Sequence, residues 1–267
     1  PAGRTACGTG ASSGMGRSIA EHLGALGAHG FLAGRTTEEM AASADLIAAA
    51  GGRADVDTFD LTDLDRLRAW IDRAATSTGR LDVLVNSAGF GDFESIVGGD
   101  PQTWKGRLEV NVLAVAVGCQ AAVLAMRRTG SEGNIITVSS TATLRRDSGV
   151  YGATKYAVNC INSTLRRELE DDTIRVTALI PGVFASNFSR HGDPSRIVAR
   201  ADAAGLTGLR LDDSRRLTPE QIVQIQAALP TTMGDTAHVA RAVEYVLGLP
   251  IELNVEELVI RPQKSLF

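Results

Sequence analysis

Thr9-Gly-Ala-Ser-Ser-Gly-Met-Gly16 is the stretch of sequence that decides the fold. It lies between a short apolar run at residues 5–9 and an amphipathic pattern at about 14–26, and a second strand-like run follows at 30–34. A glycine-rich turn at such a junction exposes free N–H groups at the positive end of the helix dipole, where a phosphate group can bind. The chain therefore opens with a predicted strand–helix–strand unit that can bind a phosphate-bearing ligand.

The three glycines of this turn have different predicted tasks. Gly10 makes the tight turn, Gly14 lets the backbone approach the phosphates, and Gly16 lets the helix pack closely on the strand. Their spacing differs from the commoner dinucleotide pattern GxGxxG, and an ordinary strand-to-helix turn is the alternative interpretation. The position directly after a first strand favours dinucleotide binding.

Strand-like and helical segments alternate along most of the chain. Such alternation predicts an α/β fold in which a parallel sheet is covered by helices on both faces, a doubly wound sheet in three layers. Beyond the opening unit, the sequence predicts helices at about 38–50 and 64–78, after Pro101, and at about 150–170 and 236–247, and strands at about 55–59, 83–86, 134–139, 174–180 and 257–260.

Length and composition fit a single domain that spans residues 1–267. The chain is 44% hydrophobic and carries a net charge of −4, so it can bury a large core and shows no bias toward nucleic acid. Its three separated cysteines and four scattered histidines predict neither a disulfide framework nor a metal site. The most apolar stretch, 112–126, is shorter than the roughly 20 residues of a membrane span, so a buried helix is expected. Without an apolar leader before residue 5, a cytoplasmic location is expected.

Residues 184–232 interrupt the alternation. They mix Arg, Asp and Gly with short helical stretches. An insertion at this point of the chain would overhang the carboxyl ends of the strands, where open α/β sheets bind their ligands. We therefore expect a substrate lid within the single domain; a solvated loop without a role in binding is the alternative.

Four separated motifs together resemble one known family from end to end, the short-chain dehydrogenase/reductases of the simple one-domain branch. The resemblance implies a Rossmann fold and a hydride transfer between a nicotinamide cofactor and a carbonyl or alcohol. The motifs, in family order, are TGASSGMG at Thr9–Gly16, NSAG at Asn86–Gly89, YGATK at Tyr151–Lys155 and PGV at Pro181–Val183.

The resemblance also implies which residues contact the cofactor. These are Gly10, Ser12, Ser13, Gly14, Met15, Gly16, Asp60, Leu61, Asn86, Ala88, Gly89, Tyr151, Lys155, Pro181, Gly182 and Val183. Among them, Asp60 is equally suited to cap the helix that follows it.

The choice between NADP(H) and NAD(H) depends on the end of the second strand. An acidic residue there would bind the ribose 2′-hydroxyl of NAD(H), but Gly34 occupies the expected place and Arg35 follows. A guanidinium suits a 2′-phosphate, so Arg35 predicts a preference for NADP(H), with NAD(H) possible. A solvated surface arginine is the alternative.

Tyr151 and Lys155 are the predicted centre of the chemistry. Residues four apart share one face of a helix, so both can act on the same small site. A phenol has an ordinary pKa of about 10, and a neighbouring ammonium favours the phenolate and lowers that value. The family resemblance adds Ser140, which would bind the substrate oxygen, and Asn111, which would hold a water that links Lys155 to solvent.

The serine assignment has an alternative one residue away. Ser140 precedes Tyr151 by 11 positions, two fewer than is usual in the family, and Ser139 precedes it by 12. Aligning the strand at 134–139 places Ser140 in the catalytic position, with a shortened loop after it. That loop brings Arg145 and Arg146 toward the entrance of the pocket.

The substrate is the least determined part of the prediction. Phe93, Phe184 and Phe188 are possible pocket walls, and the leading hypothesis is a small or medium hydrophobic ketone, aldehyde or secondary alcohol. The arginines at 145–146 and those within 184–232 favour an alternative, a 3-oxoacyl thioester on an acyl carrier.

Two further hypotheses concern partners and function class. The helices at 110–126 and after Tyr151 are apolar on more than one side, which predicts a homodimer or homotetramer. A non-catalytic dinucleotide-sensing protein or a dehalogenase on the same fold is the functional alternative. The first predicts a damaged catalytic set and the second a missing glycine-rich turn, and neither is found in the sequence.

Overall fold

The computed structural model describes residues 2–91, 94–191, 194–211 and 215–264. Within these residues a seven-stranded sheet has the order β3-β2-β1-β4-β5-β6-β7, and every strand pair is parallel. The strands are β1 (Thr5–Thr9), β2 (His29–Gly34), β3 (Arg53–Thr58), β4 (Val83–Asn86), β5 (Gly133–Val138), β6 (Ile174–Pro181) and β7 (Glu257–Ile260). The strand order reverses at β1, between β2 and β4, which is the switch point where open α/β sheets bind nucleotides.

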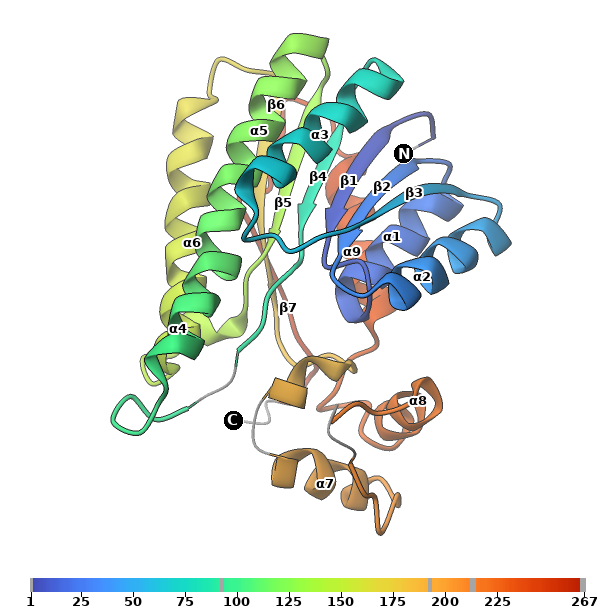
Figure 1. Ribbon diagram of the computed structural model, residues 1–267, viewed down its shortest axis with the longest axis vertical. Helices are drawn as coiled ribbons and strands as arrows, with labels where there is room; N and C mark the ends of the chain where they lie inside the picture. The colour runs from blue at the N-terminus through green and yellow to red at the C-terminus, as the bar shows by residue number, and fades with distance from the viewer. Residues whose placement is uncertain (1, 92–93, 192–193, 212–214, 265–267) are drawn as a thin grey trace.

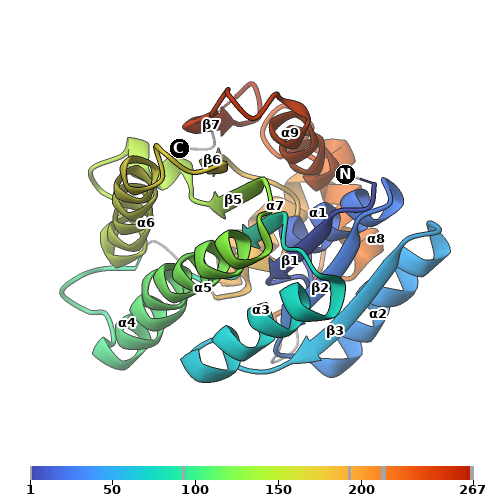
Figure 2. The ribbon, with the colours of Figure 1, turned by 90° about the horizontal axis from the view of Figure 1, so that it is seen from above.

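Helices cover both faces of the sheet (Figures 1 and 2), so the predicted doubly wound, three-layer Rossmann fold is confirmed. The helices of one face are α1 (Gly14–Ala25), α2 (Thr37–Ala49) and α9 (Thr236–Gly248). Those of the other face are α3 (Leu64–Thr78), α4 (Pro101–Leu108), α5 (Ala114–Thr129) and α6 (Gly149–Glu168).

Alternate residues along the strands supply the two hydrophobic cores. Leu84 and Ile135 pack against α3 and α5, whereas their neighbours Val85 and Ile136 pack against α1 and α9. Successive side chains of a strand point to opposite faces, so a central strand between two helical layers must be apolar on both. The central strands β4 and β5 are therefore buried throughout.

Helix boundaries follow local capping. Asp63 is the N-cap of α3 and accepts a hydrogen bond from Arg66 N (3.1 Å), and Gly79 ends this helix with a positive φ of 73°. Asp60 instead accepts hydrogen bonds from Thr62 N and Oγ1 (both 2.9 Å) in the turn before the helix. The alternative that Asp60 caps this helix is therefore wrong.

The long helix predicted after Pro101 is continuous to Thr129 but contains a π-helical turn, η1 (Glu109–Leu113), between α4 and α5. Among the described residues, Pro101–Thr129 is the one helix long and apolar enough to cross a membrane by length and composition. Half of its most apolar window is buried inside the protein, which is the packing of a core helix. A π-turn inside an α-helix is frequently found at functional sites.

The two ends of the 184–232 segment lie side by side. Phe184 forms a parallel bridge with Gly234, and Ala185 N donates to Gly234 O (2.8 Å). Its described parts include the 3₁₀ turn η3 (Asn187–His191), α7 (Pro194–Ala203) and α8 (Pro219–Ala228), which lie beyond the carboxyl ends of the strands (orange in Figure 1). Buried Ala185, Ala201 and Ile225 of the segment form a small core together with Met233, which follows it.

Candidate active site

Two adjoining cavities open at the carboxyl ends of the strands, and both reach the 184–232 segment. The nucleotide cavity is lined by Gly10, Ser12–Gly16, Gly34, Arg35, Leu61, Ser87–Phe90, Val110, Ser186, Phe188 and Arg190. The substrate cavity is lined by Met15, Ser139–Ala142, Arg145, Tyr151, Pro181–Phe184, Ser186, Phe188 and Arg200. Met15, Ser186 and Phe188 border both, so the two cavities lie side by side.

The glycine-rich turn is shaped as a phosphate cradle. Gly10 has a φ of +68°, and a Cβ atom there would lie 2.7 Å from the backbone of Ala88. A Cβ atom on Gly16 would lie 2.4 Å from the Gly10 carbonyl oxygen. A side chain at either position would collide with backbone atoms, so only glycine fits there without a shift of the chain. The steric need for glycine is shown at both positions, and pyrophosphate binding by the turn stays a prediction.

Thr9 ties this cradle to the next strand. Its Oγ1 accepts hydrogen bonds from Ser87 N (3.2 Å) and Ala88 N (3.3 Å) at the end of β4. The two strand ends on either side of the switch point are thus held together. Ala88 and Gly89 reach the nucleotide cavity as predicted.

Of the predicted cofactor residues, Asp60, Asn86 and Lys155 line neither cavity, while Tyr151 and Pro181–Val183 line the substrate cavity. Asn86 is buried, and its Nδ2 donates to Cys119 Sγ (3.3 Å) in the core below the cavity. Asp60 lies in the turn beside Leu61, and its pKa is lowered by the Thr62 hydrogen bonds and by the charge of Arg35. Arg35 and Leu61 do border the cavity.

Tyr151 lies at the wall of the substrate cavity, 6% exposed, with its hydroxyl hydrogen-bonded to Ser140. Ser140 also caps the short 3₁₀ turn η2 (Thr141–Leu144) by accepting from Ala142 N (3.1 Å). Ser139 Oγ is buried and has no hydrogen-bond partner among the described residues. The contact with the phenol favours Ser140 over Ser139 as the serine that shares a substrate oxygen with Tyr151.

Lys155 is buried one helical turn away on α6. Its Nζ donates to the Val138 carbonyl oxygen (2.9 Å) at the end of β5 and lies 5.9 Å from the centre of the Tyr151 ring. Burial lowers the pKa of Lys155 to about 8. Burial disfavours the charged form of any group, so keeping Lys155 protonated costs free energy.

The pKa of Tyr151 differs from the sequence expectation. Burial raises the pKa to about 12, although the hydrogen bond from Ser140 and the charge of Arg107 both act to lower it. Loss of water around the phenolate outweighs the cations supplied by the protein alone. Tyr151 is therefore a neutral phenol at physiological pH.

Asn111 lies in the π-turn and links three parts of the site. Its Nδ2 donates to Phe90 O (3.0 Å) and Thr154 Oγ1 (3.1 Å), and its Oδ1 accepts from Phe90 N (3.1 Å). Thr154 in turn donates to the Tyr151 carbonyl oxygen (2.7 Å). Asn111 and Lys155 approach each other across Gly89, where a Cβ atom would lie 3.1 Å from Asn111 Oδ1 and 3.5 Å from Lys155 Nζ.

The predicted aromatic walls are placed as follows. The Phe188 ring lies 5.6 Å from the Tyr151 ring, at an interplanar angle of 54°, and borders both cavities. Phe184 borders the substrate cavity. Phe93 lies outside the described residues.

The sequence analysis missed a buried ion pair behind Tyr151. Arg107 on α4 lies 2.7 Å from Glu94 Oε1, which also accepts from Trp104 Nε1 (2.6 Å). Arg107 precedes Asn111 by four positions and so lies on the same helical face, a signal that was available in the sequence. Gly91 was also missed: a Cβ atom there would lie 2.2 Å from the Tyr151 ring.

The profile of the short chain dehydrogenase family matches residues 4–195, most of the chain. This protein belongs to that family. An uncharacterized oxidoreductase of Methylorubrum extorquens is 36% identical over 184 residues, 67% of this chain and 73% of that protein. The 3beta-hydroxysteroid dehydrogenase 2 of Eggerthella lenta is 31% identical over 231 residues, 85% of this chain and 88% of that protein.

A solved short chain dehydrogenase of Burkholderia cenocepacia, in complex with NADP, has the same fold. It is 28% identical, with a TM-score of 0.77 over 97% of each chain. As a short chain dehydrogenase, the present chain is an oxidoreductase that uses a nicotinamide dinucleotide and acts on CH–OH groups.

Proposed function

We propose that this enzyme reduces the carbonyl group of a small or medium hydrophobic ketone or aldehyde with NADPH, or oxidises the matching secondary alcohol, with Tyr151 as the general acid or base. The observation that carries the proposal is the hydrogen-bonded pair of Tyr151 and Ser140 on the wall of a cavity that adjoins the cavity at the glycine-rich turn. A proton donor must lie within hydrogen-bond reach of the carbonyl oxygen on which charge develops.

The proposal assigns a role to each residue of the site. Ser140 and Tyr151 hold the carbonyl oxygen between them, and Tyr151 delivers its phenolic proton to that oxygen. The bound cofactor supplies the hydride. Lys155 stabilises the phenolate that remains, since a cation 5.9 Å from the ring centre favours the charged form. Asn111 holds the 90–91 backbone and Thr154 in place and, with Lys155 across Gly89, would position the water that returns a proton.

The end of β2 supports NADP(H) over NAD(H) as the preferred cofactor. A Cβ atom on Gly34 would lie 2.4 Å from Met40 Sδ, so an acidic side chain that could bind a ribose 2′-hydroxyl would have to displace the Met40 side chain. Arg35 borders the nucleotide cavity immediately beyond it. NAD(H) remains the alternative cofactor.

The 184–232 segment is proposed to act as a substrate lid within a single domain of residues 1–267. It contributes Phe184 and Phe188 to the substrate cavity, and Ser186 and Phe188 to both cavities. Closing the segment over the substrate would exclude water from the reacting atoms.

A 3-oxoacyl thioester on an acyl carrier is the second candidate substrate. The favouring observation is that Arg145, which is ion-paired with Asp147, and Arg200 border the substrate cavity. Two guanidinium groups at the cavity would suit an anionic substrate or carrier.

We also propose that the chain forms a homodimer or homotetramer through α5 and α6. Leu113 and Leu124 are exposed on this face, next to a groove between the two helices that includes Ile161 and Leu165. An exposed apolar helix face of this kind usually has a partner.

The decisive experiment measures NADPH and NADH consumption with a panel of ketones, aldehydes and 3-oxoacyl thioesters. Tyr151→Phe is expected to lower kcat by about 10²- to 10⁴-fold while cofactor binding stays normal. Tyr245→Phe, at an exposed tyrosine on α9, is the matched control and should behave as the wild type. Near-normal turnover of the Tyr151→Phe enzyme would refute the proposal, and cofactor binding without reduction of any carbonyl would favour the non-catalytic dinucleotide sensor.

A further inference from the structure

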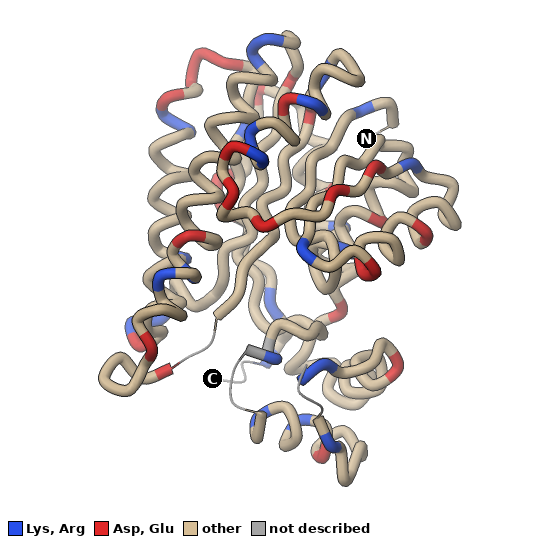
Figure 3. Tube along the Cα trace, viewed as in Figure 1, with Lys and Arg blue, Asp and Glu red and all other residues tan. Residues whose placement is uncertain are grey.

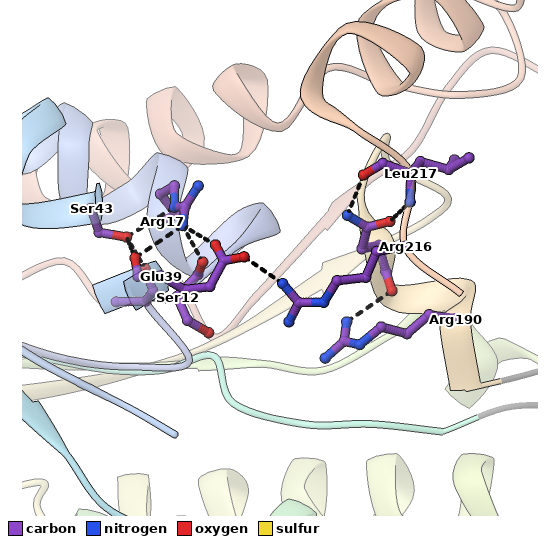
Figure 4. A network of polar contacts seen from close by, with 9 residues as sticks. Ser12, Arg17, Glu39, Ser43, Arg190, Arg216 and Leu217 are labelled. Atoms are coloured by element: carbon purple, nitrogen blue, oxygen red, sulfur yellow. Dashed lines mark hydrogen bonds and ion pairs between the residues drawn. The ribbon is translucent and has the colours of Figure 1, made fainter. Parts of the chain in front are cut away.

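Two arginines of the 184–232 segment lie at the nucleotide side of the molecule, away from the reacting atoms. Arg190 in η3 borders the nucleotide cavity that Arg35 also borders. Arg216, further along the same segment, lies 2.5 Å from Glu39 Oε1 in the first turn of α2. Figure 4 shows both arginines extending from the segment toward the helices that follow β1 and β2, and basic positions recur along the segment in Figure 3.

Asn187 fixes both arginines relative to the segment. Its side chain donates to Leu217 O (3.0 Å) and accepts from Leu217 N (2.8 Å), so η3 is joined to the residue directly after Arg216. The Asn187 carbonyl oxygen accepts from Arg190 Nη1 (2.8 Å). Arg215 has a φ of +53°, a strained conformation for a long side chain that a specific surrounding structure must hold.

Glu39 of α2 is a residue outside the segment that Arg216 contacts. Its Oε2 lies 2.6 Å from Arg17 Nη2, while Oε1 faces Arg216. Arg17 is itself held by the Ser12 carbonyl oxygen and the Ser43 hydroxyl. The carboxylate is thus held between an arginine of the glycine-rich turn's helix and an arginine of the 184–232 segment (Figure 4).

The cluster has an excess of positive charge. The pKa of Arg190 is lowered by burial first and then by the like charges of Arg216 and Arg35, against the opposing effect of Glu39. Arg35 also faces the carboxylate of Asp60. Four arginines, at 17, 35, 190 and 216, therefore lie near three carboxylates among the described residues, those of Glu39, Asp60 and Glu21. A bound dianion would relieve this mutual repulsion.

The location indicates which anion fits. The end of β2 is where a bound dinucleotide places its adenosine ribose, and NADP(H) carries a phosphate on the 2′-oxygen of that ribose. Guanidinium groups bind phosphate through paired, charge-assisted hydrogen bonds. The shared pyrophosphate, by contrast, belongs to the cradle of Gly10–Gly16.

We propose that Arg190 binds the 2′-phosphate of NADP(H) together with Arg35, and that Arg216 is a positioning residue that Glu39 holds beside them. This inference rests on the proposed preference for NADP(H). The segment that closes the substrate cavity is then also part of the nucleotide site, and the cofactor phosphate helps to hold that segment in place.

The test measures binding without any carbonyl substrate. Titration calorimetry gives the Kd of NADPH, NADH, adenosine 2′,5′-bisphosphate and 5′-AMP for the wild type and for Arg190→Ala, Arg190→Gln and Arg216→Ala. Arg210→Ala, at another arginine of the same segment, is the matched control. Cooperative urea unfolding confirms that each variant is folded.

Arg190→Ala and Arg190→Gln are expected to weaken NADPH and adenosine 2′,5′-bisphosphate by about tenfold or more, as for a lost charge-assisted hydrogen bond. NADH and 5′-AMP should change by less than about twofold, Arg216→Ala should show a smaller effect of the same kind, and Arg210→Ala should show none. Unchanged NADPH binding in both Arg190 variants, or equal losses for NADPH and NADH, would overturn the inference. A wild type without preference for NADPH would overturn the proposed cofactor choice as well, whereas failure to reduce carbonyls would touch only the proposed reaction.

Discussion

Arg107 and Glu94 form an ion pair of 2.7 Å in which the guanidinium is almost completely buried behind the catalytic wall. The pair connects α4 to the loop after β4, and the Arg107 guanidinium lies 5.8 Å from the centre of the Phe90 ring. The positive charge of Arg107 also lowers the pKa of Tyr151, in opposition to burial. A residue outside the four family motifs thus acts on Tyr151, the proposed proton donor.

Replacing Arg107 tests this connection. Arg107→Met should raise the pKa of Tyr151, so the rise of alcohol-oxidation rate with pH should shift to higher pH. It should also lower the free energy of unfolding by about 2–4 kcal/mol, because Glu94 loses its cation. Arg107→Lys, which keeps the charge, should retain most of the pH profile. A pH profile of Arg107→Met identical to that of the wild type would remove Arg107 from the proton chemistry.

Lys155 is expected to reduce stability at the pH where it functions. Its folded pKa is about 8, whereas the unfolded value is about 10.4. Between these values the unfolded chain binds more protons, so the free energy of unfolding should rise as the pH increases from about 8 to 10.4. Below pH 8 both states bind the proton, and the full cost of burying the ammonium remains.

Lys155→Met should therefore abolish carbonyl reduction yet raise the free energy of unfolding at pH 7 by about 1–3 kcal/mol. The rise of stability between pH 8 and 10.4 should flatten. Urea denaturation at several pH values measures both effects, and Lys105→Met, at an exposed lysine of α4, is the control. A variant that is less stable than the wild type at pH 7 would show that the contacts of Lys155 stabilise the fold by more than the burial of its ammonium costs.

Gly91 is expected to position the catalytic ring through its missing side chain. A Cβ atom there would lie 2.2 Å from Tyr151 Cδ2, a contact that no side chain can make without displacing the ring. Gly91→Ala should lower kcat by about 100-fold through misplacement of the phenol, while the Kd of NADPH stays within about twofold of the wild-type value. At Gly98 the added methyl group has open space, so Gly98→Ala should keep the wild-type kcat and Kd of NADPH. Equal kinetics for the two variants would refute a positioning role for Gly91.

Much of the fold could be predicted from local pattern, because periodicity and capping are local. The predicted segments 5–9, 64–78, 83–86 and 257–260 end where β1, α3, β4 and β7 end. The helices α7 and α8 could not be delineated, because they are short and their apolar residues pack into a small core that depends on the fold of the 184–232 segment. Whether Asp60 caps the following helix also needed coordinates, which show that Asp63 is the N-cap and that Asp60 accepts hydrogen bonds from Thr62 in the turn before the helix.

The candidate site also has features that the sequence predicts and features that it does not. Tyr151, Lys155 and the glycines of the cradle are tied to fixed spacings, so the sequence located them. The pKa of Tyr151 could not be predicted, because it depends on how much water the fold removes and on Arg107, a residue far away in sequence. Asn86 was expected at the cavity, but its side chain faces Cys119 instead, and a four-residue strand buried on both sides gives no signal for that direction.

The proposed oligomer makes the outer face of α5 the place to test self-association. Leu124 is 59% exposed there, beside the groove between α5 and α6. If this face packs against a second copy, Leu124→Glu buries an unpaired charge in the interface and should shift the protein toward monomers, measured by sedimentation velocity. Val97→Glu introduces the same charge at a fully exposed loop residue and should leave the assembly unchanged. A wild type that sediments as a monomer, or a Leu124→Glu variant with the wild-type assembly, would exclude this face as the interface, since a buried carboxylate in an apolar contact costs more than such an interface can absorb at one position.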